Sequence, residues 1–287
     1  MPQVIIKPAW LKKKLDLNSC RKVKVLLREF NLHTVCESAS CPNISECFSK
    51  GTATFLILGN VCTRNCAFCG IPKGSLEDID WDEPIRVAKA AKKLDLKYVV
   101  ITSVTRDDLT DGGSELFYRT ILEIKKVLPF SKIEVLIPDF KGEITSLEKI
   151  IKARPAVVGH NLETVPSLYE KIRPMANYDT SLGVLRNIKT IAPYYVYTKS
   201  GIMLGLGEKE EEVMKVLEDL RSVGCDFLSI GQYLQPSLRM VPVKEYILPQ
   251  KFEFYRQEAK KMGFLHVESS PYTRSSYCAQ SYLEGIV

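Results

Sequence analysis

Short runs of apolar, β-branched residues recur along the chain after about residue 53. They lie at 54–58, 98–102, 133–137, 156–159, 196–204, 227–231 and 264–268. Longer segments rich in Lys, Glu, Ala and Leu, which have a helical pattern, separate them at roughly 83–94, 114–127, 144–152, 181–191, 208–223 and 249–262. Strands that alternate with helices are typical of βαβ units and a parallel sheet. Six or seven such units predict an α/β fold, a partial (β/α)6-type parallel barrel.

Two parts of the chain stand outside this repeat. Residues 1–53, which include a basic, helix-like segment at 19–30, are predicted to form an N-terminal extension laid against the barrel. Residues 54–268 are assigned to the barrel, and residues 269–287 to a C-terminal tail. Because the active site of such a barrel lies at the carboxyl ends of its strands, the polar loops there should converge on one mouth. These loops lie at 62–70, 103–113, 160–165 and 205–208.

The composition is that of an ordinary globular protein, with 45% hydrophobic and 26% charged residues. The formal charge of +6 is a mild excess that bears on solubility and association more than on fold. No apolar run is long enough to cross a bilayer, and the first residues resemble neither a signal peptide nor an Arg/Ser-rich transit peptide. We therefore expect a cytoplasmic protein without a membrane partner, in which clustered cysteines point to metal binding or catalysis before disulfides.

Three cysteines, Cys62, Cys66 and Cys69, stand in the loop after the first predicted strand with the spacing C-x3-C-x2-C. Zinc usually takes four ligands, commonly from C-x2-C pairs, so a zinc knuckle would need a distant fourth ligand. A cubane iron–sulfur cluster takes one thiolate on each iron, and three cysteines leave one iron open. S-adenosylmethionine (SAM) can chelate that iron, and one electron can then break a carbon–sulfur bond to give a deoxyadenosyl radical. Phe68 would pack near the adenine.

A second trio, Cys36, Cys41 and Cys47, has the spacing C-x4-C-x5-C and again lacks a fourth ligand. A second iron–sulfur cluster with a ligand from elsewhere in the chain is the favoured interpretation, and a zinc site or inert structural thiols are the alternatives. The other cysteines and the histidines are not assigned as ligands, and most are expected to be structural. They are Cys20, Cys225, Cys278, His33, His160 and His266.

Together with the sequence RSSY at 274–277, the two cysteine motifs resemble the lipoyl synthase family of radical-SAM enzymes. The resemblance extends over nearly the whole chain, through SVTRDDLTDGG, GHNLETVPSLYEKIRP, TKSGIMLGLGE and IGQYLQPS in family order. It implies that the trio at 62–69 holds the radical 4Fe–4S cluster and that the trio at 36–47 holds an auxiliary 4Fe–4S cluster. The fourth auxiliary ligand would be a serine oxygen of RSSY, with Ser276 as the first choice and Ser275 as the second.

The resemblance also implies contacts to SAM. Asp111, Gly112 and Gly113 stand where such barrels hold the methionine amino group, and Gly205 belongs to a glycine-containing stretch that lets the backbone approach the cofactor. Further polar groups at or near strand ends are candidate contacts, and helix capping or a surface salt bridge is the alternative for each. They are Asn161, Glu163, Lys199 and Arg173, of which the first two are favoured.

The implied reaction inserts two sulfur atoms, at C6 and C8, into an octanoyl chain on a carrier lysine, with the auxiliary cluster as sulfur source and two SAM consumed. The implied partners are octanoylated 2-oxoacid dehydrogenase acyltransferase subunits and the glycine-cleavage carrier protein, an electron donor such as flavodoxin or ferredoxin, and an iron–sulfur carrier. Nucleic acid is not expected. The alternatives are a radical-SAM sulfur enzyme of the biotin synthase or methylthiotransferase type, a zinc protein that binds nucleic acid, and a scaffold that passes on intact clusters.

Overall fold

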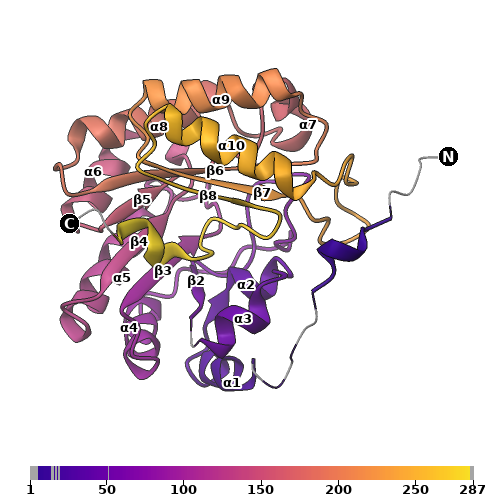
Figure 1. Ribbon diagram of the computed structural model, residues 1–287. Coiled ribbons are helices and arrows are strands. Elements are labelled where there is room, and N and C mark those ends of the chain that lie inside the picture. The colour runs from indigo at the N-terminus through magenta and orange to yellow at the C-terminus, as the bar shows by residue number, and fades with distance from the viewer. Residues whose placement is uncertain (1–5, 14–15, 17, 19, 51, 285–287) are drawn as a thin grey trace.

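One curved sheet of eight strands organises the chain (Figure 1). The computed structural model describes residues 6–13, 16, 18, 20–50 and 52–284. The strands are β1 (His33–Thr34), β2 (Thr54–Ile57), β3 (Tyr98–Ser103), β4 (Lys132–Leu136), β5 (Val157–Gly159), β6 (Tyr197–Leu204), β7 (Phe227–Gln232) and β8 (His266–Ser270). They pair in sequence order, β1 antiparallel to β2 and the others parallel. Within the described residues no ladder joins β8 to β1, so the barrel is partial, and this α/β fold confirms the predicted one.

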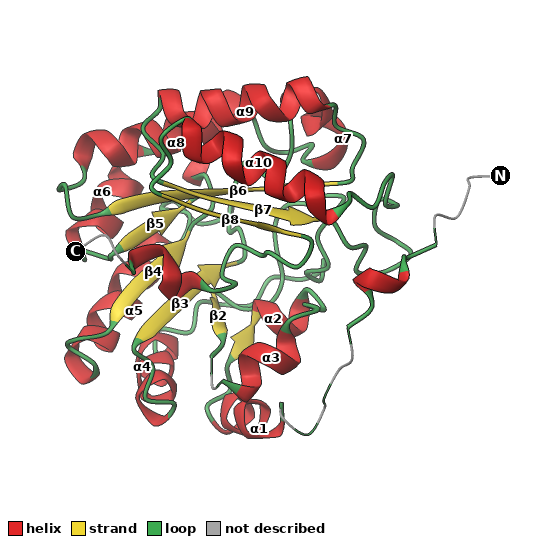
Figure 2. Cartoon of the chain, viewed as in Figure 1, coloured by secondary structure: helices red, strands yellow, loops and turns green. Residues whose placement is uncertain are grey.

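Helices cover the outer, convex face of the sheet (Figure 2). They are α4 (Glu83–Lys93), α5 (Ser114–Val127), α6 (Ile144–Lys152), α8 (Tyr178–Ile191), α9 (Glu210–Ser222) and α10 (Pro249–Lys261). All six match predicted helices. The largest difference is at the start of α8, because the Asn177 side chain accepts a hydrogen bond from the Thr180 amide and caps the helix earlier than the apolar pattern indicates. No helix in the described part of the chain is long and apolar enough to span a membrane.

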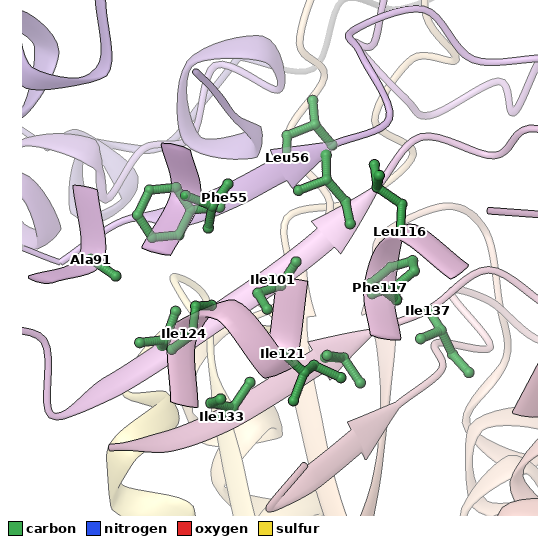
Figure 3. Packing of buried hydrophobic residues seen from close by; sticks show 14 of the residues in the cluster. Phe55, Leu56, Ala91, Ile101, Leu116, Phe117, Ile121, Ile124, Ile133 and Ile137 are labelled. Atoms are coloured by element: carbon green, nitrogen blue, oxygen red, sulfur yellow. The ribbon is translucent and has the colours of Figure 1, made fainter. Parts of the chain in front are cut away.

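The outer core lies between the strands and these helices (Figure 3). Phe55 and Ile101 are partners in register on β2 and β3, and both side chains are fully buried. Phe117 and Ile121 of α5 belong to the same buried cluster. Each such side chain contributes about 1.5–3 kcal/mol through burial. This core fixes the strand ends, and hence the loops that follow them.

The segments before β2 are short. They are the 3-10 helix η1 (Ala9–Leu11), α1 (Arg21–Glu29), α2 (Val35–Ser38) and α3 (Ile44–Ser49). Helix α1 occupies most of the basic segment predicted at 19–30, of which residue 19 lies outside the described residues. Because β1 pairs with β2, part of this extension joins the sheet. The division of the chain at residues 53 and 268 stays a prediction.

The C-terminal tail fills the inside of the barrel at its base. It ends in the 3-10 helix η4 (Ala279–Leu283), whose Tyr282 is fully buried. The Tyr282 ring lies 5.5 Å from the Phe227 ring, centroid to centroid, and packs with Val157. Phe227 and Val157 are the first residues of β7 and β5, so the tail closes the amino ends of the strands. The opposite, carboxyl ends are left for a site.

Candidate active site

A cavity of about 340 Å³ opens inside the barrel, chiefly toward the carboxyl ends of the strands. Residues from both cysteine trios, from the loop after β5 and from the tail line it together. Those that the sequence singled out are Cys36, Cys41, Cys62, Cys66, Phe68, Cys69, His160, Asn161, Glu163, Arg173, Met203, Ser275 and Ser276. The prediction that loops 62–70 and 160–165 converge is thus confirmed, and only the first residues of 103–113 reach the cavity. Loop 205–208 does not line it.

The loop of the second trio is tied to its neighbours by backbone hydrogen bonds. Thr63 donates to the Thr105 carbonyl at 3.0 Å, and Ala67 donates to the Ile172 carbonyl at 2.9 Å. The Cys69 amide donates to the Cys66 carbonyl at 3.2 Å, which turns the chain between the two thiols. Burial raises the pKa of Cys69 to about 11, and the neighbouring thiols add to the shift. The Cys69 thiol is therefore protonated until a metal displaces the proton.

Arg64, inside the same loop, is a residue that the sequence reading missed. Its guanidinium is 6% exposed and binds two carboxylates, Asp107 after β3 and Asp139 after β4. The N–O distances are 2.7 Å from Nε to Asp107 Oδ2 and 2.5 Å from Nη1 to Asp139 Oδ2. Burial opposes ionisation of Asp139, but the hydrogen bonds from Arg64 lower its pKa. Acidic residues after two adjacent strands, with a basic residue in the cysteine loop, are the sequence signal that could have revealed this anchor.

The first trio lies across the cavity, on α2 and α3 and the turn between them. Burial raises the pKa of Cys36 to about 12, and the thiols of Cys41 and Cys47 add to the shift. Burial likewise raises the pKa of Cys47 to about 11. Cys47 does not line the cavity itself. The three thiols therefore form one electrostatically coupled group beside the second trio.

The two serines of RSSY face different groups. The Thr54 hydroxyl donates to Ser276 Oγ at 2.7 Å, and the same Thr54 hydrogen-bonds the Cys36 thiol. Ser275 Oγ instead accepts a hydrogen bond from Asn161 Nδ2 at 2.6 Å. Ser276 therefore belongs to the surroundings of the first trio, and Ser275 to those of the loop after β5.

Polar groups in that loop form a connected set. Asn161 also donates to Glu163 Oε1 at 3.0 Å, and Arg173 Nη1 donates to the Asn161 carbonyl at 3.1 Å. Glu163 has φ of 69°, a left-handed conformation that costs a non-glycine residue energy and is frequent at functional sites. Burial raises the pKa of the Glu163 carboxyl. Asn161, Glu163 and Arg173 thus reach the cavity from one short segment.

Two buried nitrogen atoms on lining residues have no hydrogen-bond partner among the described residues. They are Nε2 of His160, whose Nδ1 lies 2.9 Å from the Ile137 carbonyl, and Nε of Arg173. Burial lowers the pKa of His160 to about 4, so the ring is neutral. Unpaired buried polar atoms call for a partner, and these two fit a polar ligand.

The residues at 111–113 do not line the cavity, and their contact to SAM stays a prediction. The Asp111 carboxylate accepts hydrogen bonds from the amides of Gly113 at 2.9 Å and Glu115 at 2.8 Å, and so caps α5. A Cβ atom at Gly112 would come within 2.7 Å of the Phe140 ring, and Gly113 has φ of 90°. Helix capping and close packing account for all three residues of this motif.

Gly205 and Lys199 are also placed away from the cavity. Gly205 has φ of 97°, and a Cβ atom there would overlap the Gln232 side chain. Lys199 is buried with Glu134, at an N–O distance of 3.0 Å, near the base of the barrel. The glycine of that segment that lines the cavity is Gly201. In the structure both residues have packing or pairing partners, and their contacts to SAM stay predictions.

The remaining cysteines and histidines lie outside the two trios, and one of them, His160, lines the cavity. Cys20 and Cys225 are buried, and Cys278 is exposed. His266 lies 3.0 Å from Glu268 Oε1, and His33 belongs to β1.

The donor set fits iron–sulfur clusters. Within the described residues no three His, Cys, Asp or Glu side chains converge closely enough to hold a single metal ion. Each trio supplies three thiols, the ligand type that iron–sulfur clusters take. The chemistry of the donors therefore agrees with a multi-iron cluster at each trio.

Comparison with known proteins identifies the family. A sequence model described as the radical SAM superfamily matches residues 56–220. The lipoyl synthase of Caldicellulosiruptor saccharolyticus is 55% identical over 275 residues, which cover 96% of this chain and 96% of the relative. The mitochondrial lipoyl synthase of Nematostella vectensis is 50% identical over 278 residues, 96% of this chain and 95% of the relative. The chain belongs to the lipoyl synthase family. It is therefore a radical-SAM enzyme.

Solved structures of other enzymes share the fold of this chain. Methylornithine synthase aligns with a TM-score of 0.56 at 15% identity, over 89% of this chain and 82% of that chain. SuiB of Streptococcus suis, bound to S-adenosylmethionine, aligns with a TM-score of 0.60 at 11% identity, over 86% of this chain and 53% of that chain. At such identities the likeness shows the fold alone. Membership of the radical SAM superfamily makes a 4Fe–4S cluster and SAM the cofactors of this lipoyl synthase homologue.

Proposed function

We propose that the enzyme inserts two sulfur atoms, at C6 and C8, into an octanoyl group joined by an amide bond to a carrier lysine, giving lipoyl-lysine. The observation that carries this proposal is that residues of both cysteine trios line one cavity, together with Ser275 and Ser276. A substrate in that cavity would lie within reach of both groups of thiols. A protein that only stores or passes on clusters has no need of such a shared space.

In this proposal Cys62, Cys66 and Cys69 hold the radical 4Fe–4S cluster. Three thiolates leave one iron open for SAM, and the bound cluster supplies the electron that breaks a carbon–sulfur bond of SAM. Phe68 lines the cavity between the last two of these thiols and would contact the adenine. Asn161 and Glu163, which line the cavity and are joined by a hydrogen bond, would bind the polar part of SAM.

Cys36, Cys41, Cys47 and Ser276 would hold the auxiliary 4Fe–4S cluster, which supplies the sulfur. The hydroxyl of Ser276 shares Thr54 with the Cys36 thiol, which supports Ser276 over Ser275 as the fourth ligand. A serine oxygen is a harder ligand than a thiolate and matches iron–sulfur chemistry less well. The iron that it binds would be the more easily released, as a cluster that gives up its sulfur requires.

The cavity suits an alkyl chain. Its wall includes apolar residues from the inner ends of several strands and from the loops after them, namely Leu56, Val104, Leu136, Ile137, Ile202 and Met203. An unactivated C–H bond is beyond any side-chain base, so the chain's own residues can only position the octanoyl group and exclude water. One SAM would be used at each of the two carbons, which makes two SAM per lipoyl group.

The partners follow from this reaction. The octanoylated substrates would be 2-oxoacid dehydrogenase acyltransferase subunits and the glycine-cleavage carrier protein. Flavodoxin or ferredoxin would donate electrons, and an iron–sulfur carrier would rebuild the auxiliary cluster. A cytoplasmic location stays a prediction.

The test is an anaerobic reaction of reconstituted protein with SAM, a strong reductant and an octanoyl-lysyl peptide, read by mass spectrometry. A peptide with two added sulfur atoms, as the dithiol or as the disulfide with two fewer hydrogens, would establish the activity. Deoxyadenosine without that product would place the substrate in doubt. Neither product, from protein that holds both clusters, would indicate a cluster carrier.

Single cysteine variants separate the two trios. Cys62→Ala removes a ligand of the radical cluster, and we expect SAM cleavage to fall to background. Cys41→Ala removes an auxiliary ligand, and we expect deoxyadenosine but no sulfur-containing peptide. Lipoyl product from Cys41→Ala would show that the auxiliary site is not the sulfur source.

A further inference from the structure

Two segments far apart in the sequence are joined beside the first trio. Asn43, which precedes α3, donates from Nδ2 to the Tyr272 carbonyl at 2.7 Å. Glu46, within α3, accepts a hydrogen bond from the Tyr277 hydroxyl at Oε1 at 3.1 Å. The first pair is 229 residues apart in sequence and the second 231, so the N-terminal extension and the tail hold each other at two points.

Lys13 completes this contact from the first described segment of the chain. Its Nζ donates to Glu46 Oε2 at 2.6 Å and to Asn43 Oδ1 at 3.0 Å. The same ammonium lies 5.1 Å from the ring centroid of Tyr272 and 5.9 Å from that of Tyr277. Such distances allow a cation–π attraction to both rings. We call these five residues, Lys13, Asn43, Glu46, Tyr272 and Tyr277, the clasp.

The clasp lies next to the first trio and next to Ser276, in the sequence as well as in space. Glu46 directly precedes Cys47, and Tyr277 directly follows Ser276. The hydrogen bond between Glu46 and Tyr277 therefore limits how far the serine can move from α3. A further hydrogen bond, from Thr54, holds Ser276 itself.

We propose that Glu46 and Tyr277 are positioning residues, which hold Ser276 against the iron of the auxiliary cluster by joining the tail to α3. The inference rests on the proposed function of the first trio. Neither residue is a ligand. Loss of their hydrogen bond leaves the three thiolates in place but lets the serine depart more often, so the iron that it binds is released faster.

The barrel itself does not depend on this contact. Tyr282, five residues beyond Tyr277, is fully buried against Phe227 and holds the end of the tail in the base of the barrel. Tyr277 is only partly buried, and replacement by Phe keeps its ring. Tyr277→Phe therefore releases the serine loop without unfolding the chain.

The experiment isolates the auxiliary site. In a full-length background with Cys62, Cys66 and Cys69 all replaced by Ala, only the first trio can hold a cluster. We would reconstitute this protein, measure iron and sulfide, and follow cluster absorbance as a chelator removes iron. Tyr277→Phe and Glu46→Ala should each speed iron release about tenfold, as expected for loss of a hydrogen bond to a charged group, and the double variant should add little to Glu46→Ala.

Two further variants serve as controls. Glu46→Gln keeps an acceptor for the Tyr277 hydroxyl and should retain most of the protection. Tyr178→Phe removes a matched hydrogen bond, 3.0 Å from the hydroxyl to Asp219 Oδ2 between α8 and α9, and should leave release unchanged. In protein that retains both cysteine trios, the Tyr277→Phe variant should still cleave SAM.

The outcomes are distinguishable. Release from Tyr277→Phe within about twofold of the background protein would overturn the clasp and leave the auxiliary cluster standing. An equal acceleration in Tyr178→Phe would also overturn it, because general loosening would then be the cause. A background protein that holds no iron and sulfide would overturn the auxiliary cluster and the clasp together.

Discussion

The buried pair Lys199–Glu134 allows a test of whether Lys199 serves as a SAM contact or as a structural ion-pair partner. The resemblance implied that Lys199 contacts SAM, whereas the structure pairs it with Glu134, with side chains 3% and 2% exposed. The other Glu134 oxygen accepts a hydrogen bond from the Tyr98 hydroxyl at 2.6 Å. The Lys199 ammonium also lies 3.6 Å from the Tyr282 ring centroid. The perturbation is Lys199→Met, which keeps a long apolar side chain and removes the charge.

The loss of stability that we expect for Lys199→Met follows from the unpaired Glu134 carboxylate that the variant leaves. Glu134 would be left buried without its counter-ion, and removing one partner of a buried pair costs about 3–5 kcal/mol. The hydrogen bond from Tyr98 persists, so we expect the lower end, about 3 kcal/mol. The double variant Lys199→Met/Glu134→Gln leaves no buried charge and should recover most of that loss.

Urea unfolding of the apo protein, followed by circular dichroism, gives the free energy of unfolding of each variant. Calorimetric titration of SAM into cluster-loaded protein gives the dissociation constant. We expect Lys199→Met to lower the free energy of unfolding with an unchanged SAM dissociation constant. An unchanged free energy of unfolding together with about tenfold weaker SAM binding would refute this reasoning and restore Lys199 as a cofactor contact.

Two other substitutions test the tail and the pH response. A Cβ atom at Gly231 of β7 would overlap the carbonyl oxygen of Thr273, so Gly231→Ala should push the tail away from the sheet. In the protein whose Cys62, Cys66 and Cys69 are replaced by Ala, iron analysis of this variant should then show less bound iron. A full iron content would contradict the reasoning. Burial raises the pKa of Glu83, which accepts a hydrogen bond from the Leu58 amide at 2.9 Å, to about 7 from 4.5. The folded chain therefore binds the Glu83 proton more tightly, so this stabilisation is complete below pH 4.5 and falls by about 3 kcal/mol as the pH rises to 7. Urea unfolding across that range should show a shallower decline for Glu83→Gln, and parallel pH curves would contradict the assignment.

Most of the fold could be predicted because its signals are local. The strands at 98–103 and 227–232 are short apolar runs bounded by polar loops, and the helices at 114–127 and 249–261 repeat apolar residues with helical spacing. The tail has no such period. Tyr282 is buried because the barrel has an open base, a property of the assembled sheet that no window of sequence contains.

The candidate site also has parts with a local sequence signal and parts that depend on the assembled barrel. Cysteine spacing is a local pattern, and residues of both trios reach one cavity in the structure. The glycines at 112, 113 and 205 show where sequence reasoning stops, because a backbone that approaches a cofactor and a backbone that packs against a side chain both exclude a Cβ atom. Arg64 was missed because its partners, Asp107 and Asp139, come from two different strand ends. Only the assembled barrel brings them together.

The position of the tail links the two ends of the barrel. Between β8 and η4 it passes Gly231, where the absence of a side chain lets the Thr273 carbonyl approach the sheet, and it then presents Ser276 beside Thr54. Tyr282 fixes it below, in the base of the barrel, and Tyr277 fixes it above, on α3. Ser276 therefore lies between the point where Thr273 meets β7 and the attachment of Tyr277 to α3. In the proposed auxiliary site, loss of the Tyr277 attachment would therefore free the serine from the iron, while Tyr282 would still hold the tail in the base of the barrel.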